Sequence, residues 1–401
     1  MLTLLKNLKG DKAIWGVVAL LALFSFLPVY SASTNLVYVL GKGTTAGHLF
    51  KHGLLLFLGF AIIYAVHRIP AHYFKGLSII ALPIVLLLLA YTLTVETNIG
   101  GVRANRWIQI PFIGVNFQTS TLASVVLMVW IARYLSKIKD TAITFKESVL
   151  PLWLPTALVI LLILPENFST ATILSFMVIV MCFLGGYPLK YLFSIVGVGL
   201  VMAGMFLFVL FKTPEILPGQ RAITWRSRLE SFWNPDSASA DSTHQPTLAK
   251  IAIAEGGIVG KGAGKSVMKN MLSQSTSDFI FAIIIEEYGL LGGGALVFFY
   301  LLLLFRIVVV ANAAEKIFTK LLIIGVGLPI VFQAFINMAV VVQLFPVTGQ
   351  PLPLISMGGT SIWMTCLAIG IVLSASKKNE TDGASQEVDE THPLEVLSGQ
   401  L

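Results

Sequence analysis

Charged residues are scarce in this sequence, and their scarcity excludes an ordinary soluble domain. Asp, Glu, Lys and Arg make up 12% of the 401 residues and hydrophobic residues 56%, whereas soluble domains are about 25% charged. Apolar runs of roughly twenty residues recur along the chain, the length that crosses a bilayer as a helix. These runs lack the period-two alternation of barrel strands, and in lipid only helices and closed barrels satisfy their own backbone. We therefore predict an all-α polytopic membrane protein.

Cysteine and leader-peptide features are also nearly absent. The two cysteines, Cys182 and Cys366, lie inside apolar runs, so we interpret them as small buried residues rather than a disulfide or a metal pair. Residues 1–30 hold lysines followed by an apolar stretch, but the stretch is long and lacks a clear small-x-small cleavage site. It is interpreted as a retained first span, not as a signal peptide.

Ten apolar segments have the length and composition of membrane-spanning helices. We expect them at 13–30, 53–68, 76–95, 118–136, 149–165, 169–186, 190–211, 278–305, 319–343 and 360–376. With the N-terminus inside, the short outward loops hold far fewer basic residues than the inward segments, only Lys42, Lys51, Arg103 and Arg106. The positive-inside rule and the even number of spans therefore place both termini in the cytoplasm.

Two long segments fall outside the spans. Residues 212–277, between the seventh and eighth spans, are predicted to form a large extracytoplasmic loop, so that residues 1–376 make one ten-helix membrane domain. Residues 377–401 are rich in acidic groups, and we expect them to be a disordered acidic cytoplasmic tail. The net charge of +7 suits anionic lipid headgroups or a phosphate-bearing substrate.

Arg103 and Arg106, in the outward segment 100–120, run against the positive-inside trend. The planar fork of a guanidinium suits phosphate, so both arginines are candidate ligands of a phosphate-bearing substrate. Trp107 follows them, and its ring is typical of an anchor at the headgroup interface.

Glycines and lysines gather in GGIVGKGAGKS, residues 256–266. A nucleotide-binding P-loop is excluded, because Gly264-Lys265-Ser266 would need a glycine at position 259, where Val259 stands. Closely spaced glycines nevertheless let a backbone approach a ligand. Lys261 and Lys265 lie among them, and we interpret both lysines as candidate anion ligands.

Asp278 stands where a long polar segment gives way to an apolar helix, and two interpretations remain open. In the first, Asp278 or Ser277 is the N-cap of a helix over 278–287, a position that aspartate favours. In the second, Asp278 is a carboxylate at the lip of an apolar cavity, where partial desolvation makes it a useful base.

Glu286 and Glu287 lie two turns deeper in the same helix. Ionisable residues within a span are functional by default, and the structural alternative is that both are bonded to neighbouring helices. The region 278–305 would be about 42 Å long as one helix, at 1.5 Å per residue, which exceeds the roughly 30 Å hydrocarbon core. Either it protrudes outward, or 278–287 is a half-helix followed by a span from Gly289.

FPVTGQPLPLISMGGTS, residues 345–361, holds three prolines and three glycines between the last two spans. We predict a rigid, non-helical outward segment, which at membrane depth is tolerated only when it is buried in protein or lines a cavity. It has no titratable side chain, so we expect it to contribute shape and backbone hydrogen bonds.

Taken in order, four stretches resemble the signatures of the SEDS family (shape, elongation, division and sporulation), whose members include FtsW, RodA and SpoVE. They are Arg106-Trp107-Ile108 with Phe117-Gln118, GGIVGKG at 256–262, SDFIFAIIIEEYG at 277–289 and PVTGQPLPLISMGGTS at 346–361. The similarity runs over about residues 10–376. It implies a ten-helix glycosyltransferase that polymerises lipid II into peptidoglycan strands at the outer face of the bacterial cytoplasmic (inner) membrane.

The resemblance also implies a chemistry. Asp278 falls on the family's essential aspartate, a general base that deprotonates the 4-hydroxyl of the acceptor sugar for attack on the donor's anomeric carbon. Undecaprenyl pyrophosphate would leave with inversion, and its charge would need cations and a divalent metal, Mg²⁺ or Mn²⁺. The expected ligands of lipid II and its pyrophosphate are Arg103, Arg106, Lys261, Lys265, Gln118 and Ser356. The residues expected to support the site are Trp107, Glu286 and Glu287.

The expected partners are a class B penicillin-binding protein that crosslinks the strands, other divisome proteins and membrane lipids, with no nucleic acid. The wording of SDFIFAIIIEEYG and the long tail favour the cell-division branch of the family, which is FtsW-like, over the RodA-like elongation branch. A place at the division septum follows from that branch.

Two stretches depart from the family pattern. After Phe-Gln the family reads Pro-Ser-Glu-x-x-Lys, whereas Thr121 and Ser124 stand in place of the acid and the lysine. Leu272-Ser273-Gln274 replaces Leu-Pro-Glu upstream of Asp278. Two alternatives stay open: a transporter that flips lipid II, which predicts polar residues through the bilayer midplane, and a structural divisome subunit whose activity has decayed.

Overall fold

The computed structural model describes residues 8–38, 41, 43–95, 98–99, 102–103, 107–110, 115–139, 141, 143–212, 221–234, 240–272 and 274–377. Eight of its helical runs are long and apolar enough to cross a membrane. They are α2 (Lys12–Tyr38), α3 (Thr45–Val66), α4 (Tyr73–Thr94), α5 (Thr119–Ile138), Phe145–Ile163, α9 (Leu189–Lys212), α12 (Ile280–Ala313) and α13 (Ile317–Val341). The run Phe145–Ile163 consists of α6 (Phe145–Ser148), a π-helical turn (Val149–Trp153) and α7 (Leu154–Ile163).

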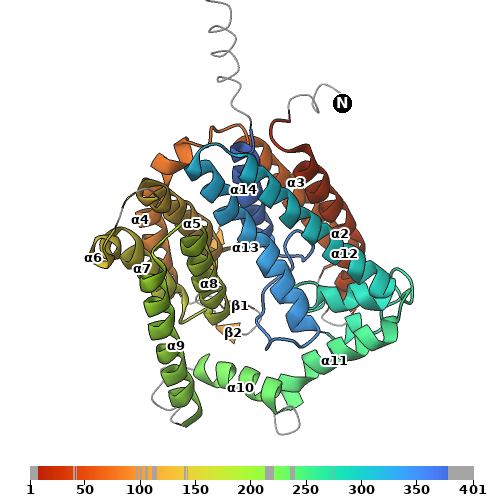
Figure 1. Cartoon of the computed structure of the whole chain (residues 1–401). Coiled ribbons are helices and arrows are strands. Elements are labelled where there is room, and N and C mark those ends of the chain that lie inside the picture. The colour runs from red at the N-terminus through yellow and green to blue at the C-terminus, as the bar shows by residue number, and fades with distance from the viewer. Residues whose placement is uncertain are drawn as a thin grey trace, which may run out of the picture.

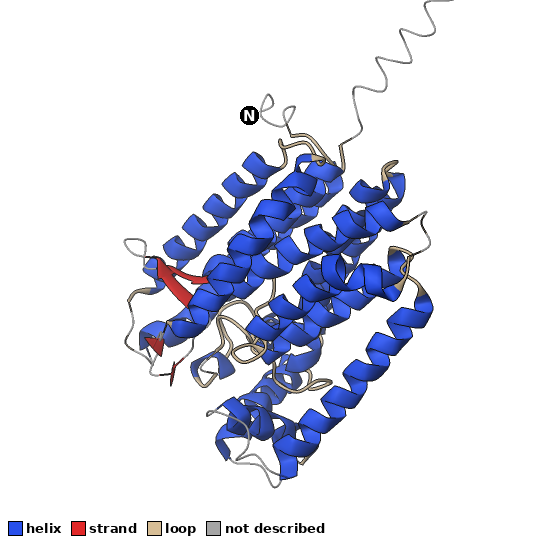
Figure 2. Ribbon diagram, turned by 90° about the vertical axis from the view of Figure 1, so that its left-hand side faces the viewer, coloured by secondary structure: helices blue, strands red, loops and turns tan. Residues whose placement is uncertain are grey.

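Two shorter apolar helices, α8 (Phe168–Leu184) and α14 (Gly359–Ala375), accompany these eight. Together the ten helical runs fall on the ten segments expected from hydropathy. The predicted fold class, a polytopic helical membrane protein, is confirmed (Figure 2).

The beginning of the first span and the end of the last lie side by side. The backbone N–H of Asp11, which precedes α2, donates to Ser376 Oγ at 3.0 Å, just after α14. The Asp11 carboxylate pairs with Arg306 of α12. Figure 1 shows this pole at the top and α10 (Arg221–Trp233) and α11 (Ala240–Gly256) at the opposite pole. This arrangement agrees with the expected topology, and the predicted tail lies outside the described residues apart from Lys377.

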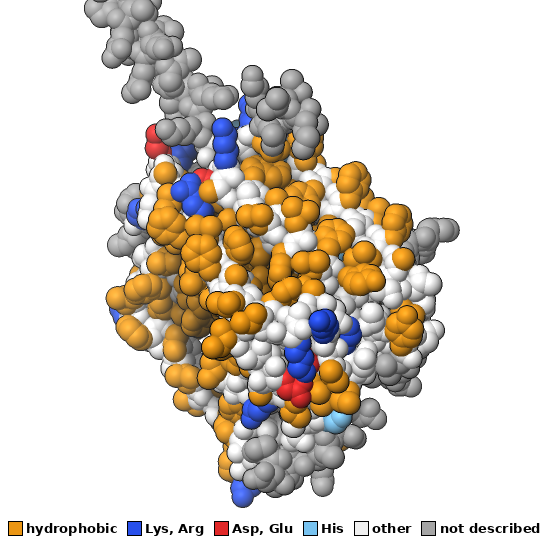
Figure 3. All heavy atoms as spheres, turned by 90° about the vertical axis from the view of Figure 1, so that its right-hand side faces the viewer, with side chains coloured by type: hydrophobic (Ala, Val, Ile, Leu, Met, Phe, Trp, Pro, Cys, Tyr) orange, Lys and Arg blue, Asp and Glu red, His pale blue; other side chains and the backbone are white. Residues whose placement is uncertain are grey.

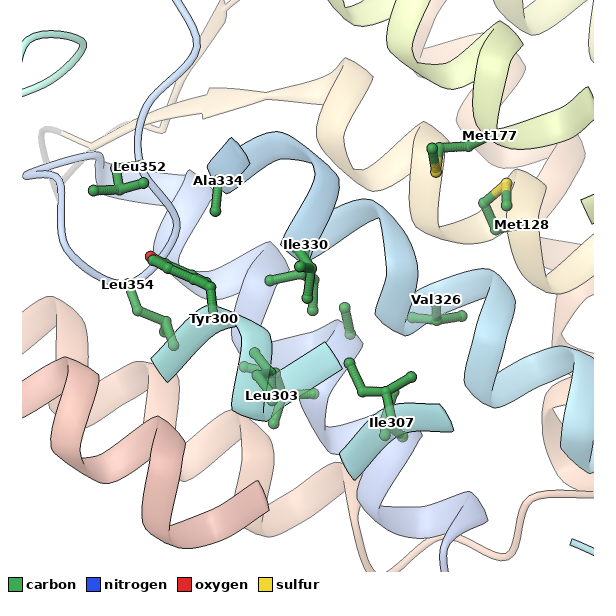
Figure 4. Packing of buried hydrophobic residues seen from close by; sticks show 14 of the residues in the cluster. Met128, Met177, Tyr300, Leu303, Ile307, Val326, Ile330, Ala334, Leu352 and Leu354 are labelled. Carbon is green, nitrogen blue, oxygen red and sulfur yellow. The ribbon is translucent and has the colours of Figure 1, made fainter. Parts of the chain in front are cut away.

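α13 runs through the centre of the bundle. Most of its residues are buried, whereas most residues of α9 are exposed on the surface of the bundle. Figure 4 shows the buried side chains that meet around α13, among them Met128, Met177, Tyr300, Leu303, Ile307, Val326 and Ile330. Between helices in lipid, such close van der Waals packing is a main source of association. On the outer surface, hydrophobic side chains cover the middle of the face in Figure 3, as contact with lipid requires.

Two small hairpins at the outer pole were not expected from the sequence. β1 (Asn98–Ile99) pairs antiparallel with β2 (Val102–Arg103), and β3 (Trp107–Ile110) pairs antiparallel with β4 (Val115–Gln118). The segment 212–277, predicted as a large loop, is largely helical in its described part. It contains α10, α11 and the 3₁₀ turn η3 (Met268–Asn270).

α12 is broken at Gly289, whose φ of 66° and ψ of −170° are not helical. The residues before it, 280–288, form a half-helix, and the span proper continues from Gly289. Of the two alternatives left open for this long segment, the half-helix followed by a span is therefore confirmed.

Candidate functional site

The glycine-rich segment 256–262 holds the half-helix of α12 through backbone hydrogen bonds. The N–H of Lys261 donates to the carbonyl of Glu286 at 2.9 Å, and the N–H of Leu290, just past the break, donates to the carbonyl of Gly257 at 2.9 Å. Backbone groups released by the break at Gly289 therefore find partners in this segment, as buried peptide groups must.

Two glycines make this approach sterically possible. A Cβ on Gly256 would stand 2.2 Å from the carbonyl oxygen of Ile285, and a Cβ on Gly260 would stand 2.3 Å from that of Glu287. From the sequence, the closely spaced glycines were expected to let the backbone approach a ligand. At these two positions it is the backbone of α12 that comes close instead.

Glu286 is fully buried and accepts hydrogen bonds from several groups of the glycine-rich region. Its carboxylate bonds Ser266 Oγ, the N–H of Val267 at 2.9 Å and Lys261 Nζ at 3.0 Å. Lys261 also pairs with Glu255. Hydrogen bonds to Glu255 and then Glu286 raise the pKa of Lys261 above its ordinary value. Two carboxylates thus already match its charge, and an anionic substrate would compete with them.

Glu287 connects the same region to α2. It accepts a hydrogen bond from Ser31 Oγ and one from the N–H of Ser266 at 3.3 Å, and Ser31 Oγ in turn accepts from Lys269 Nζ at 3.1 Å. Both Glu287 and Lys269 are buried. These contacts match the structural alternative for Glu286 and Glu287: each is bonded to neighbouring elements and fixes the outer segment to the bundle.

Asp278 lies just before α12 and is half-buried. The helix begins at Ile280 with Phe279 as its N-cap, so the prediction that Asp278 or Ser277 caps the helix was wrong. The backbone carbonyl of Asp278 accepts a hydrogen bond from Asn337 Nδ2 at 2.8 Å. Its carboxylate lies beside Gly349, where a Cβ would stand 3.4 Å from Asp278 Oδ2.

The residues immediately before Asp278 are tied to the segment 346–358. Ser356 Oγ donates to the carbonyl of Ser277 at 2.6 Å and accepts from the N–H of Leu352 at 2.7 Å. The N–H of Met357 donates to the carbonyl of Thr276 at 2.9 Å. Ser356 was predicted to bind substrate, but it is 2% exposed and its hydroxyl is engaged on both sides. In this structure it orients the approach to Asp278.

The segment between α13 and α14, residues 342–358, is non-helical, as predicted, but residues 359–361 of the predicted stretch belong to α14; residues 352–356 are buried and most others are half-buried. Its polar groups bond helices around it: Gln350 Nε2 donates to Thr170 Oγ1 at 3.0 Å, and Gln333 Nε2 of α13 donates to the carbonyl of Pro351 at 2.9 Å. These bonds allow irregular backbone inside the bundle, where no water would otherwise satisfy it.

A cavity of about 80 Å³ opens beside this segment, between α5, α8, α13 and α14. None of its described lining residues carries a charge. The polar ones include Thr121, Ser124, Thr170, Gln333, Gln350 and Thr365. Thr121 and Ser124 are the two positions at which the family pattern has a glutamate and a lysine, so one of the two departures from that pattern lies at the wall of this cavity.

The β3–β4 hairpin places two further predicted residues near α14. Trp107 lies opposite Gln118 in the antiparallel register. Gln118 is buried, its N–H donates to Thr360 Oγ1 at 3.1 Å and its side-chain amide donates to Ser120 Oγ at 3.1 Å. Gln118 thus joins the hairpin to the beginnings of α5 and α14.

The remaining predicted cations are only partly placed. Lys265 is exposed in the glycine-rich region. Arg103 belongs to β2, opposite Asn98, and Arg106 lies outside the described residues. The binding of pyrophosphate by these cations stays a prediction.

Within the described part of the chain, no three His, Cys, Asp or Glu side chains gather as a metal site would require. These residues therefore do not fit a metal centre built by the protein alone. Mg²⁺ commonly binds through one or two carboxylates together with substrate phosphates, so the predicted divalent cation concerns the enzyme–substrate complex.

Sequence reasoning missed two residues that hold the candidate base. Asn337 is an uncharged residue within a span. Gly349 belongs to the proline-rich segment 345–361, which was expected to contribute only shape and backbone hydrogen bonds. Gln333 and Asn337 stand one turn apart on an otherwise apolar helix, and this spacing was the available sign that one face of α13 bonds a backbone.

The comparisons with known proteins agree with this architecture. The model of a family of cell cycle proteins, that of FtsW, RodA and SpoVE, matches residues 11–381. A protein of Coxiella burnetii named "Probable peptidoglycan glycosyltransferase FtsW" is 30% identical over 374 residues, which are 91% of this chain and 96% of that protein.

Solved structures share the fold. A chain from a peptidoglycan synthase complex, studied for its coordination of polymerization and crosslinking, matches with a TM-score of 0.70 and 25% identity over 92% of this chain and 97% of that chain. The rod shape determining protein RodA of Thermus thermophilus matches with a TM-score of 0.64 and 24% identity over 92% of this chain and 98% of that chain. With a family model that covers nearly all of the chain, this protein belongs to the FtsW, RodA and SpoVE family of cell cycle proteins.

Proposed function

We propose that this protein is a peptidoglycan glycosyltransferase that polymerises lipid II at the outer face of the bacterial cytoplasmic membrane. One observation carries the proposal: the carboxylate of Asp278 lies beside Gly349, whose neighbour Gln350 lines the cavity, and near the end of α12 opposite Arg306. With the topology predicted from the positive-inside rule, the pole of the Asp11–Arg306 pair is cytoplasmic and Asp278 lies toward the outer one. The name of the Coxiella burnetii relative supports the same activity.

The proposed reaction uses Asp278 as a general base. Its carboxylate takes the proton of the acceptor sugar's 4-hydroxyl, and the oxygen attacks the anomeric carbon of the donor. The bond from that carbon to undecaprenyl pyrophosphate breaks, with inversion. Developing negative charge on the leaving group calls for preorganised cations, a role we assign to Arg103, Arg106 and Lys265. A divalent cation, Mg²⁺ or Mn²⁺, would enter with the pyrophosphate and neutralise part of its charge.

We also propose a class B penicillin-binding protein as the partner and the division septum as the place of action. A protein of this fold occurs in a peptidoglycan synthase complex that combines polymerization with crosslinking, which supports a crosslinking partner. The FtsW name of the relative supports the division branch over the elongation branch.

Reconstitution in proteoliposomes with lipid II and Mg²⁺ or Mn²⁺, with and without a class B penicillin-binding protein, tests this function. We expect glycan polymer. Translocation of lipid II without polymer would point to a flippase instead. Neither polymer nor translocation, with the partner present, would point to a structural subunit without activity.

A further inference from the structure

Asn337 joins the candidate base to the cavity wall. Its side-chain Nδ2 donates to the backbone carbonyl of Asp278 at 2.8 Å and to the backbone carbonyl of Gln350 at 2.7 Å. Gln350 lines the cavity, and Gly349, the residue before it, lies against the Asp278 carboxylate. One amide group therefore spans two chain segments that are far apart in sequence and that meet at the site.

The orientation of this amide is fixed by its partners. Turned by 180°, Asn337 would place its oxygen against two carbonyl oxygens, which cannot donate. In the observed orientation Asn337 Oδ1 is buried and has no hydrogen-bond partner among the described residues. A buried acceptor without a partner is costly. Asn337 thus donates to both backbone carbonyls, while its own Oδ1 is left without a hydrogen bond among the described residues.

We propose that Asn337 is a positioning residue for the glycosyl transfer: its amide sets the place of the Asp278 backbone relative to Gln350 and thereby aims the Asp278 carboxylate at substrate beside the cavity. This inference rests on the proposed function, because it takes Asp278 to be the base. Asn337 is buried at the centre of the bundle on α13, so the reference point that it provides is rigid.

Asn35 provides a matched control. It is also a buried asparagine, and its Nδ2 likewise donates to two backbone carbonyls, those of Lys269 and, at 2.8 Å, Leu272. Its two bonds hold the same outer segment, but to α2 and away from Asp278 and Gln350. Replacing either asparagine removes the same kind of structural support, and only the Asn337 replacement releases Asp278.

The test measures kcat, KM for lipid II and the melting temperature of the full-length protein for Asn337→Asp and Asn35→Asp. Asn337→Asp keeps the volume of the side chain but cannot donate twice. We expect it to lower kcat roughly ten- to hundredfold, as misplacement of a catalytic group does, with KM changed less than about twofold. Asn35→Asp should lower the melting temperature while kcat stays close to wild type. Asn337→Ser, which keeps one donor, should give an intermediate kcat if Asn337→Asp does not accumulate.

Two results would overturn the inference: wild-type kcat in the Asn337 variants, or a loss of kcat that follows the loss of melting temperature equally at Asn337 and Asn35. Asp278→Asn, measured in the same series, separates this outcome from a failure of the proposed function. If Asp278→Asn is inactive while the Asn337 variants keep their kcat, only the positioning role fails. If Asp278→Asn polymerises at the wild-type rate, the assignment of the base itself fails.

Discussion

Gly349 lies against Asp278 at the outer pole of the bundle, and a Cβ on Gly349 would stand 3.4 Å from Asp278 Oδ2. The φ of Gly349 is +67°, a left-handed conformation that costs a residue with a Cβ about 1–2 kcal/mol. The proline-rich segment therefore brings bare backbone next to the carboxylate, and a glycine meets both the conformational and the spatial requirement.

We predict that Gly349→Ala lowers polymerase activity by more than its loss of stability explains. The new methyl group would strain the backbone and lie in contact with the carboxylate, in the space that an acceptor hydroxyl needs. The rate of glycan formation and the melting temperature would be measured together.

Gly186→Ala is the control, because Gly186 has a similar φ of +77° and no atom within 4 Å of a Cβ. It should lose comparable stability, about 1–2 kcal/mol, and keep its activity. Equal activity in the two variants would contradict a special role for Gly349.

Glu286→Gln should destabilise the protein strongly. The substitution removes the charge of a fully buried side chain that is paired with Lys261 and bonded by Ser266 and Val267. A hydrogen bond to a charged group contributes about 1.5–3 kcal/mol, so removing the charge of this buried carboxylate should weaken the bonds from Ser266 and Val267 by that order. Chemical unfolding in detergent, followed by tryptophan fluorescence, measures the difference.

Glu255 pairs with the same lysine from an exposed position, with its side chain 40% accessible. Exposed pairs contribute at most about 1 kcal/mol, so Glu255→Gln should have a small effect. Similar losses of stability in Glu286→Gln and Glu255→Gln would show that burial does not determine how much Glu286 contributes to stability.

Two adjacent glycines should respond differently to alanine. Gly256→Ala would place a Cβ 2.2 Å from the backbone of Ile285, which cannot move without moving α12, whereas Gly257 has a φ of +55° and open space. We expect Gly256→Ala to cost about 3 kcal/mol or more through overpacking and Gly257→Ala only the about 1–2 kcal/mol of its backbone conformation. Expression level and melting temperature would be measured for both variants. A larger loss of stability in Gly257→Ala than in Gly256→Ala would contradict the close approach of Gly256 to α12.

The pH dependence of stability should reveal the pairing of Lys261. Its pKa is raised above the ordinary 10.5, first by the hydrogen bond to Glu255 and then by that to Glu286. Folding therefore favours the charged lysine, so its stabilisation is complete below pH 10.5 and is lost as the pH rises through the higher folded-state value. The difference in melting temperature between wild type and Lys261→Met should be constant below about pH 10 and should shrink as the pH rises above 10.5. A difference that stays unchanged above pH 10.5, or that already narrows below about pH 10, would contradict the raised pKa.

The bundle could be predicted from sequence because the bilayer imposes it. Hydrocarbon thickness sets the length of the spans and the positive-inside rule sets their direction. Both constraints are visible in the local composition of the sequence. For α12 the sequence left two alternatives, one long helix that protrudes outward or a half-helix followed by a span from Gly289. Its break is stabilised by a hydrogen bond that the Gly257 carbonyl accepts and one that the Lys261 N–H donates, and such long-range backbone pairing leaves no local pattern beyond Gly289 itself.

The candidate site was predicted in part for a related reason. Asp278 stood out as a carboxylate at a polar-to-apolar boundary, but its position before the N-cap and its neighbours Gly349 and Asn337 depend on tertiary contacts. Hydroxyl and amide side chains such as Ser356 and Asn337 look alike in a sequence whether they bind substrate or hold a backbone. The hairpin that places Gln118 was missed because each of its strands has only four residues, so that the alternation in Val115–Gln118 is too short to stand out.

The central claim is that the carboxylate of Asp278 carries the chemistry, and one measurement tests it most directly. Asp278→Asn keeps the shape of the side chain and removes its basicity. Glu230→Gln, which neutralises an acid of α10 that pairs with Arg226 at 2.7 Å, is the control. Both variants would be purified with a class B penicillin-binding protein and given lipid II with Mg²⁺ or Mn²⁺. The account predicts folded Asp278→Asn protein that makes no glycan polymer and Glu230→Gln protein with wild-type activity. Polymer at the wild-type rate from Asp278→Asn would contradict it.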